Sequence, residues 1–316
     1  MRPLHLWLLL GAGWVLPSQA ADVEYWLDRL AGAQQLSFVG SFAYERDGAF
    51  STHRLWRQVE PDGHVRERLQ QLDGEGLEIV RENGQLLCSS HGQPLQAAGA
   101  SASAPIGVAQ HLQVARLTEG YTLRLQGATR VAGRDAVVLS VSPRDQHRYG
   151  LELHLDSATA LPLKSLLLNE KGQLLERLQF VQFEPQGETP MARQALVPGT
   201  DCRPAETSAL QSSAASGGWH AAWLPPGFAL DGAIAESSLT WLRYSDGLAH
   251  FSVFVEPLRG AVADDVRSQF GPTAAVSRRM KVEQGDVMVT VVGEVPPGTA
   301  ERVALSVRDD GVAVAP

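Results

Sequence analysis

The stretch SFVGSFAYERDGAFSTHRLW, residues 37–56, decides the fold expected for the first half of the chain. Its aromatic residues and one glycine fall at every second position, at Phe38, Gly40, Phe42 and Tyr44. This is the spacing of a β-strand that has one apolar face. Asp47-Gly48 follows, and an Asx-Gly pair readily takes the positive φ angles of a two-residue hairpin turn. We therefore expect two antiparallel strands joined at this turn.

Further turn signals continue this pattern along the chain. They recur at intervals of 10 to 15 residues, at Asp62-Gly63, Asp73-Gly74 and Asn83-Gly84. A second strand-like block runs from Tyr121 to Phe183 and contains turn residues but no intervening helix. A continuous antiparallel sheet of this length usually curls into a barrel or half-barrel. The first half of the chain is therefore predicted to be a curved antiparallel half-barrel.

Helical spacing occurs at two places in the same half. Behind a capping residue, Asp22, one apolar face repeats every three to four residues, at Val23, Trp26, Leu27 and Leu30. A weaker helical stretch is expected at 106–117. We expect these helices to cover the sheet.

A linker and a smaller domain are predicted to follow. Over 185–218 the periodic pattern fades into Pro, Gly, Ser and Ala, which is typical of a linker. Strands are then predicted near 239–245, 248–256, 274–282 and 286–294. Residues 299–308 fit a strand or a helix, and we choose the helix because a Pro-Pro-Gly-Thr start signal precedes them.

The predicted fold is mainly β with an α+β second domain. Its parts are a signal peptide at 1–20, a half-barrel covered by helices at 21–184, a linker at 185–218 and a C-terminal domain at 219–316.

The chain begins like an exported protein. Arg2 precedes an apolar run from Leu4 to Leu16, and the small residues Ser18 and Ala20 precede a predicted cut after Ala20. The run is shorter than the roughly 20 apolar residues that cross a bilayer. A formal net charge of −8 over 316 residues argues against a dedicated nucleic-acid binder, which needs a basic surface.

The common motifs of catalysis and metal binding are missing from the sequence. It holds no GxSxG, HExxH, P-loop or CxxC motif, and no two histidines lie four residues apart on a predicted helix. We expect no catalytic residue, no metal ligand and no cofactor. The two cysteines, Cys88 and Cys202, can pair in an oxidising compartment, and two buried thiols are the alternative.

Two sets of residues are candidates for lipid binding. An acyl chain could lie on the aromatic residues of the first strands, which otherwise form the core beneath the helices: Phe38, Phe42, Tyr44 and Trp56. Phosphate could be bound by either of two basic clusters, for which solvated charges are the alternative: Arg144, His147 and Arg148, or Arg278, Arg279 and Lys281.

A third set is a candidate for binding a protein partner. Aromatic residues flank the turn at Asp246-Gly247, namely Trp241, Tyr244, Phe251 and Phe254. The candidates for partner binding are Trp241, Tyr244 and Phe254. One face of this hairpin should pack on the predicted helix at 299–308, and the other should be exposed. Exposed aromatic clusters are typical anchors of interfaces, so we expect the partner on that face.

Six segments also carry a family resemblance. They are SFVGSFAYERDGAFSTHRLW, PRDQHRYGLELHLD, LPLKSLLLNEKGQLLER, WLPPGF, YSDGLAHFSVFVEP and VVGEVPPGTAERVALSV. Together they resemble the MucB/RseB proteins, periplasmic regulators of an extracytoplasmic-function sigma factor pathway. The resemblance spans residues 22–308 and is weakest at 89–105 and 185–218.

The resemblance implies a function as well as a fold. It implies a half-barrel like that of the LolA-type lipoprotein carriers, and a second domain that helps hold the periplasmic part of a membrane-spanning anti-sigma factor of the MucA or RseA type. It further implies that binding shields this factor from a site-1 protease and that lipopolysaccharide or a related lipid releases it. A periplasmic carrier of lipid or lipoprotein is the alternative, and homo-oligomers stay an open question.

Overall fold

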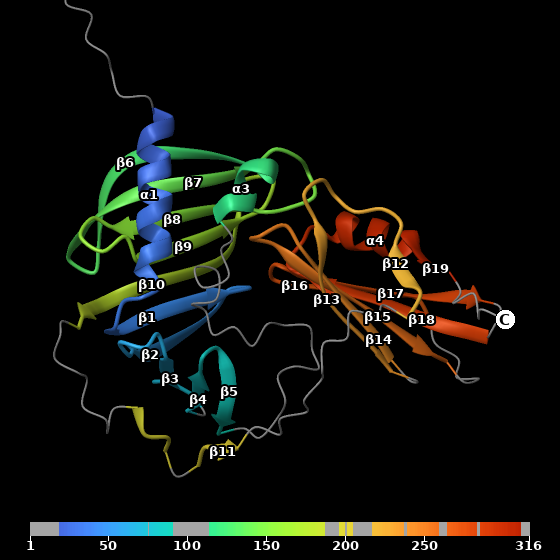
Figure 1. The fold of residues 1–316 in the computed structure, drawn as a ribbon, viewed down its shortest axis with the longest axis horizontal. Coiled ribbons are helices and arrows are strands. Elements are labelled where there is room, and N and C mark those ends of the chain that lie inside the picture. The colour runs from blue at the N-terminus through green and yellow to red at the C-terminus, as the bar shows by residue number, and fades with distance from the viewer. Residues whose placement is uncertain are drawn as a thin grey trace, which may run out of the picture.

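The structure is a computed structural model with two antiparallel sheets, one in each half of the chain (Figure 1). It describes residues 19–74, 76–90, 114–186, 196–199, 201–204, 217–236, 239–258, 264–282 and 285–310. The predicted leader therefore lies almost entirely outside the described residues. The predicted domain boundaries stay predictions, because much of 185–218 lies outside them too. No helix among the described residues is long and apolar enough to cross a membrane.

The N-terminal sheet has eleven strands among the described residues. They are β1 (Phe38–Arg46), β2 (Ala49–Val59), β3 (Val65–Gln71), β4 (Glu78–Glu82), β5 (Gln85–Ser89), β6 (Tyr121–Val131), β7 (Arg134–Pro143), β8 (Gly150–Asp156), β9 (Pro162–Leu168), β10 (Leu174–Pro185) and β11 (Arg203–Pro204). Their order is β11-β5-β4-β3-β2-β1-β10-β9-β8-β7-β6. The two outer strands do not pair with each other, so the predicted open, curved antiparallel sheet is confirmed.

The predicted tight turns form at two of the four Asx-Gly pairs, whereas at Asp62-Gly63 and Asp73-Gly74 only the glycine has a positive φ and longer loops join the strands. Asp47 and Gly48 have φ angles of 52° and 74°, and Asn83 and Gly84 have 50° and 79°. Positive φ at both central residues is the geometry that matches the right-handed twist of the flanking strands. These turns fix β1 against β2 and β4 against β5.

Helices α1 (Gln19–Ala33) and α3 (Val114–Gly120) pack on the sheet, and Figure 1 shows α1 lying across one face of it. The predicted apolar face of α1 is confirmed, since Val23, Leu27 and Leu30 are buried. They pack with residues of α3 and of β6 to β8: Leu117, Tyr121, Leu139, Val141, Leu151, Leu153 and Leu155. Of the helical stretch expected at 106–117, the part before α3 lies outside the described residues.

The C-terminal sheet has six strands in the order β13-β14-β15-β18-β17-β16. They are β13 (Ala229–Glu236), β14 (Leu239–Ser245), β15 (His250–Pro257), β16 (Val266–Phe270), β17 (Thr273–Val282) and β18 (Gly285–Gly293). Four of them were predicted, and β13 and β16 were not. Helix α4 (Pro297–Ser306) confirms the choice of a helix, although the chain turns into a short strand, β19 (Val307–Asp309), that pairs with β12 (Trp219–Ala221).

The core of this half lies between α4 and one face of the sheet. Ala300, Val303 and Ala304 of α4 are buried against it. The sheet contributes mostly β-branched and aromatic side chains: Leu242, Tyr244, Phe251, Val253, Val255, Val276, Val289 and Val291. The opposite face of the sheet is left without a covering helix among the described elements (Figure 1).

Cys88 and Cys202 form a disulfide, with their Cα atoms 5.5 Å apart. The short strand β11 continues from this bond and pairs with β5. Gly199 adds a backbone N–H that donates to Glu78 Oε1 at 2.9 Å. The chain that leaves the N-terminal sheet after β10 therefore returns to the far edge of the same sheet before it crosses to the C-terminal one.

We predict that removing this bond destabilises the protein by about 2–4 kcal/mol, because the bond closes a long loop in the unfolded chain. The variant is Cys88→Ser with Cys202→Ser, and the free energy of unfolding is measured in urea. The native chain in reductant serves as a control and should lose a similar amount. Mass measurement after thiol alkylation checks the premise: two alkylated thiols in the native protein without reductant would contradict the bond.

Candidate functional site

The aromatic residues predicted to hold a lipid are largely core. Phe38 and Phe42 are 1% and 0% exposed. Both rings pack edge-on against Phe180 of β10, with centroids 6.0 and 5.5 Å apart. Tyr44, on the same face, is half-buried and donates its hydroxyl hydrogen to Glu176 Oε2 at 2.8 Å. The structure thus shows the alternative reading, a filled core, and no open acyl site at these residues.

The grouping of Trp56 with Phe38 and Phe42 is wrong. Successive side chains of a strand point to opposite faces, and Leu55, the neighbour of Trp56, is buried with Phe42. Trp56 therefore lies on the other face of the sheet. There the guanidinium groups of Arg54 and Arg68 each lie 5.1 Å from its ring centroid.

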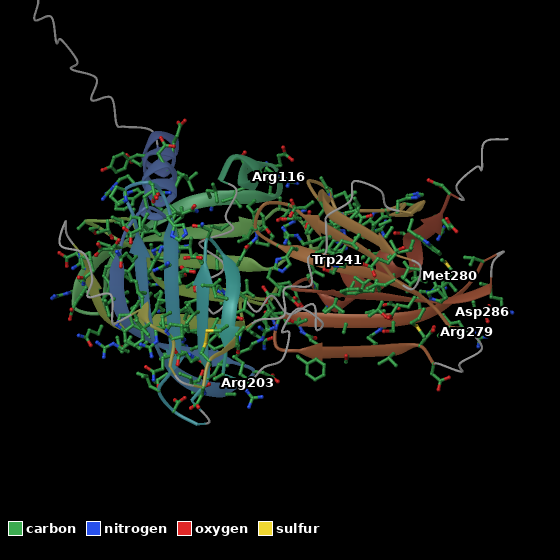
Figure 2. All side chains as sticks on the ribbon, turned by 60° about the horizontal axis from the view of Figure 1, so that its bottom comes forward. Arg116, Arg203, Trp241, Arg279, Met280 and Asp286 are labelled. Carbon is green, nitrogen blue, oxygen red and sulfur yellow. A yellow bond between two sulfur atoms is a disulfide. The ribbon has the colours of Figure 1, made fainter. Side chains whose placement is uncertain are left out.

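The basic cluster on β17 does not reach the N-terminal sheet. Arg278, Arg279 and Lys281 lie at the end of the strand farthest from that sheet, as Figure 2 shows for Arg279 and its partner Asp286. Thr273, at the other end of β17, is the residue that contacts the N-terminal sheet. Six residues of strand span about 20 Å, so this cluster and the aromatic residues of the N-terminal sheet do not form one lipid site.

The other basic cluster, 144–148, forms a junction between the two sheets instead of a phosphate site. Arg148, in the loop between β7 and β8, is 1% exposed. Its Nη1 donates to Asp246 Oδ2 at 2.6 Å, in the turn between β14 and β15. Its Nη2 donates to Asp145 Oδ2 at 2.9 Å and to the Pro226 carbonyl at 2.5 Å. The buried positive charge therefore already has two carboxylates.

Asp246 is satisfied just as fully. Its Oδ2 also accepts from the Tyr121 hydroxyl at 3.0 Å, and its Oδ1 accepts from the backbone N–H groups of Leu248 and Ala249. A buried ion pair is tolerated only when such extra hydrogen bonds compensate for lost hydration. Gly120, at the end of α3, leaves the room for it, since a Cβ there would collide with the Arg148 guanidinium.

The WLPPGF segment, 223–228, packs against the Arg148–Asp246 pair. Arg116 of α3 lies where the two sheets meet (Figure 2), and its Nη2 donates to the carbonyls of Gly227 and Ser245 at 2.9 and 2.8 Å. The Arg148 guanidinium lies 5.2 Å from the ring centroid of Phe228. In the sequence, WLPPGF stands out only as one of the segments that carry the family resemblance. Its use as a docking segment was missed because nothing local in it indicates its partner.

A second set of contacts joins the sheets at the end of β1. Arg46 Nη1 lies 3.5 Å from Glu176 Oε2 and 3.6 Å from Glu294 Oε1, in the loop after β18. Its Nη2 donates to the Thr273 hydroxyl. Burial, with a smaller contribution from the charge of Glu294, raises the pKa of Glu176 to about 7. A cleft of about 400 Å³ lies beside these contacts, lined by Glu45, Asp47, Gly48, Leu174, Leu175, Gln269 and Gly271.

The aromatic residues predicted to bind a partner divide between two faces. Tyr244 is core, which corrects its assignment: it is 4% exposed, its ring stacks on Phe251 at 5.3 Å, and its hydroxyl accepts from the Ala221 N–H. Trp241 and Phe254 are cross-strand neighbours on the opposite face, and both are half-buried. Of the three aromatic residues expected on this face, Trp241 and Phe254 lie there and Tyr244 does not.

We predict that Arg148→Met lowers the free energy of unfolding by about 3–5 kcal/mol, because Asp246 would be left as a buried, uncompensated charge. Urea unfolding of the full chain measures this. Arg130→Met is the matched control, since its pair with Asp135 spans 3.8 Å and both side chains are highly exposed. An exposed pair of this kind contributes about 1 kcal/mol or less. Equal effects of the two substitutions would contradict the role of Arg148.

Comparison with known proteins gives matches along nearly the whole chain. The family model described as the MucB/RseB N-terminal domain matches residues 22–200, and that of the MucB/RseB C-terminal domain matches 213–308. The chain is 52% identical to the sigma factor AlgU regulatory protein MucB of Pseudomonas aeruginosa, over 99% of each chain.

Solved structures match both sheets as well. The complex of Pseudomonas aeruginosa MucA and MucB aligns with a TM-score of 0.79, at 51% identity, over 92% of this chain and 100% of that one. A crystal structure of MucB in complex with MucA(peri) aligns with a TM-score of 0.75, at the same identity and coverage.

Proposed function

Because the chain belongs to the MucB/RseB family, we propose that it is a non-catalytic periplasmic regulator that binds the periplasmic part of a membrane-spanning anti-sigma factor. One observation carries this proposal: structures of a relative in complex with MucA match both sheets at about half identity. The leader-like segment at 1–20 supports export to the periplasm. The sigma-factor regulatory role of the 52% identical relative supports the regulatory class.

A carrier of lipid or lipoprotein is the less favoured function. A carrier needs an accessible apolar cavity, and the aromatic rings at the centre of the N-terminal sheet pack on one another. It also has no evident need for a second sheet that is joined through a buried ion pair. A regulator that must present one composite surface to a partner does benefit from such a junction.

The outer face of the C-terminal sheet is the surface we propose for the anti-sigma factor. Trp241 and Phe254 lie side by side there, opposite the face that packs on α4. The same face continues through Thr290, the residue that pairs with Phe254 on β18. Half-buried aromatic residues surrounded by smaller ones are the usual anchors of protein interfaces.

We predict that the native chain forms a stoichiometric complex with the periplasmic domain of a MucA-type anti-sigma factor. Titration calorimetry measures the affinity, and Phe254→Ala should weaken it by about 1–3 kcal/mol, or about 5- to 150-fold. Leu305→Ala, on the exposed side of α4 and thus across the sheet from Phe254, is the control and should bind as the native chain does.

Two outcomes would contradict parts of this proposal. No complex with the native chain would contradict the function itself. Native affinity in a folded Phe254→Ala variant, as judged by an unchanged thermal midpoint, would leave the function in place but refute this surface.

Shielding of the partner and its release by lipid complete the proposal. Since Phe38 and Phe42 are buried, acyl chains would reach them only in a second conformation in which their packing opens. Lipid would then act by shifting the chain toward that conformation, and the partner would prefer the first one. Linkage requires lipid and partner to weaken each other by the same factor.

We predict that intact lipopolysaccharide lowers the affinity for the anti-sigma domain by about 5- to 150-fold, the range of a coupling of about 1–3 kcal/mol. Deacylated lipopolysaccharide is the control and should have little effect, because exposed ionic contacts are weak and screened by salt. If both forms released the anti-sigma domain equally, the charge of the head group and not the burial of acyl chains would be the cause. Release by neither would remove lipid sensing from the proposal.

A further inference from the structure

Two carboxylates from different sheets approach one guanidinium at the end of β1. Arg46 and Glu176 are neighbours in the register between β1 and β10. Glu294 comes from the C-terminal half, in the loop between β18 and α4. Both carboxylates lie within 3.6 Å of Arg46 Nη1. We call Arg46, Glu176, Glu294 and Thr273 the Arg46 contact.

The Arg46 contact has an excess of negative charge when both carboxyl groups are ionised. Within the described ranges, Arg46 is the one cation that pairs with either carboxylate. The Glu176 side chain is 11% exposed, and those of Arg46 and Glu294 are each 28% exposed. Keeping a net negative charge in such a place is unfavourable, and one bound proton removes it.

The groups around the Arg46 contact do not neutralise its net negative charge. Tyr44 donates to Glu176, and its ring has His53 as a neighbour at 6.3 Å, whose pKa is lowered by burial. Tyr149 donates to the Val295 carbonyl beside Glu294. Other charged groups nearby are Glu170, which acts on Tyr149 together with Glu294, Glu45, which pairs with Arg177, and Asp47.

Both carboxyl groups bind protons more tightly here than in water. Burial is the largest cause for Glu176, whose pKa rises to about 7, and the charge of Glu294 adds to it, whereas Tyr44 and Arg46 act in the opposite direction. Burial also raises the pKa of Glu294, against the charge of Arg46. A raised pKa means that the stabilisation is complete below the ordinary value for Glu and is lost as the pH rises through about 7.

We propose that the Arg46 contact is an acid-strengthened latch between the two sheets, closed when Glu176 and Glu294 share a proton and loosened when both are ionised. The Arg148–Asp246 pair joins the same two sheets separately and keeps them connected when the latch loosens. The latch is a property of the chain itself, so it stands whether or not an anti-sigma factor binds.

The first test is a titration of the Glu176 carboxyl group in the full chain by ¹³C NMR. We expect a midpoint near 7 in the native protein and a lower midpoint in Glu294→Gln, because the neighbouring charge is gone. An ordinary midpoint between about 4 and 5 in the native protein would overturn the latch. An unchanged midpoint in Glu294→Gln would overturn the sharing of a proton across the sheets.

The second test measures the separation of the sheets. Phe50 and Phe270 are 69% and 65% exposed and lie next to the contact, on the β1–β2 and β16–β17 hairpins. Both native cysteines are in the disulfide, so spin labels go specifically to Phe50→Cys and Phe270→Cys. Pulsed electron resonance at pH 5.5 and 8.5 then gives the fractions of molecules with the latch closed and open.

We expect the ratio of closed to open latch to fall by up to about 30-fold between these pH values, the limit for a carboxyl group with a pKa of about 7 closed and about 4.3 open. Glu176→Gln should stay closed at both pH values. Glu82→Gln, in an exposed pair with Arg66, is the control and should respond as the native chain does. The same distances at both pH values in the native background, or a full response in Glu176→Gln, would overturn the proposal.

Discussion

The pairing of β1 with β10 is the constraint on which the rest of the structure depends. It joins two meanders that are far apart in the sequence into one sheet. The same register sets Phe42 against Phe180 in the core and Arg46 against Glu176 at the rim. A bulge between Ser41 and Phe42 shifts the register of these two strands. The shifted register sets both the core pair and the pair at the rim.

Because of this pairing, two different sets of contacts join the N-terminal sheet to the C-terminal half. The loop that holds Arg148 follows β7, on the β10 side of the sheet, and it reaches the C-terminal half through a fully buried pair. The end of β1 reaches the same half through a partly exposed group in which carboxylates outnumber cations. In the Arg148–Asp246 pair, hydrogen bonds compensate for the lost hydration of both charges. In the Arg46 contact, a bound proton balances the charge.

Local features of the fold could be predicted from the sequence, and non-local ones could not. Three local features follow from residues close together in the chain: the Asx-Gly turns at 47–48 and 83–84, the strands that flank Asp246-Gly247, and the amphipathic face of α1. The outward pairing of Trp241 with Phe254 belongs to this class, because a single hairpin fixes it. The helix α4 was found from its start signal.

The errors concern the face on which a side chain lies and the partner that a charge finds. Trp56 and Phe42 lie on different strands, so only the register between these strands shows that they lie on opposite faces. Tyr244 and Trp241 lie three residues apart on β14, and alternation along this one strand already separates them. Arg148 read as a phosphate ligand because its carboxylate partner Asp246 lies about a hundred residues away. Charge in sequence carries no information on which opposite charge the fold will supply.

The return of the chain to the edge of the N-terminal sheet limits how far the two halves can move apart. Between Cys202 and Trp219 there are 17 residue steps, which span at most about 60 Å when fully extended. Without the disulfide and β11, the tether would begin at Pro185 and have 34 steps. For a linker that already spans its sites, effective concentration falls roughly as the −3/2 power of length, so this doubling would lower it about threefold. By shortening this connection, the disulfide and β11 raise the effective concentration of one half of the molecule at the other.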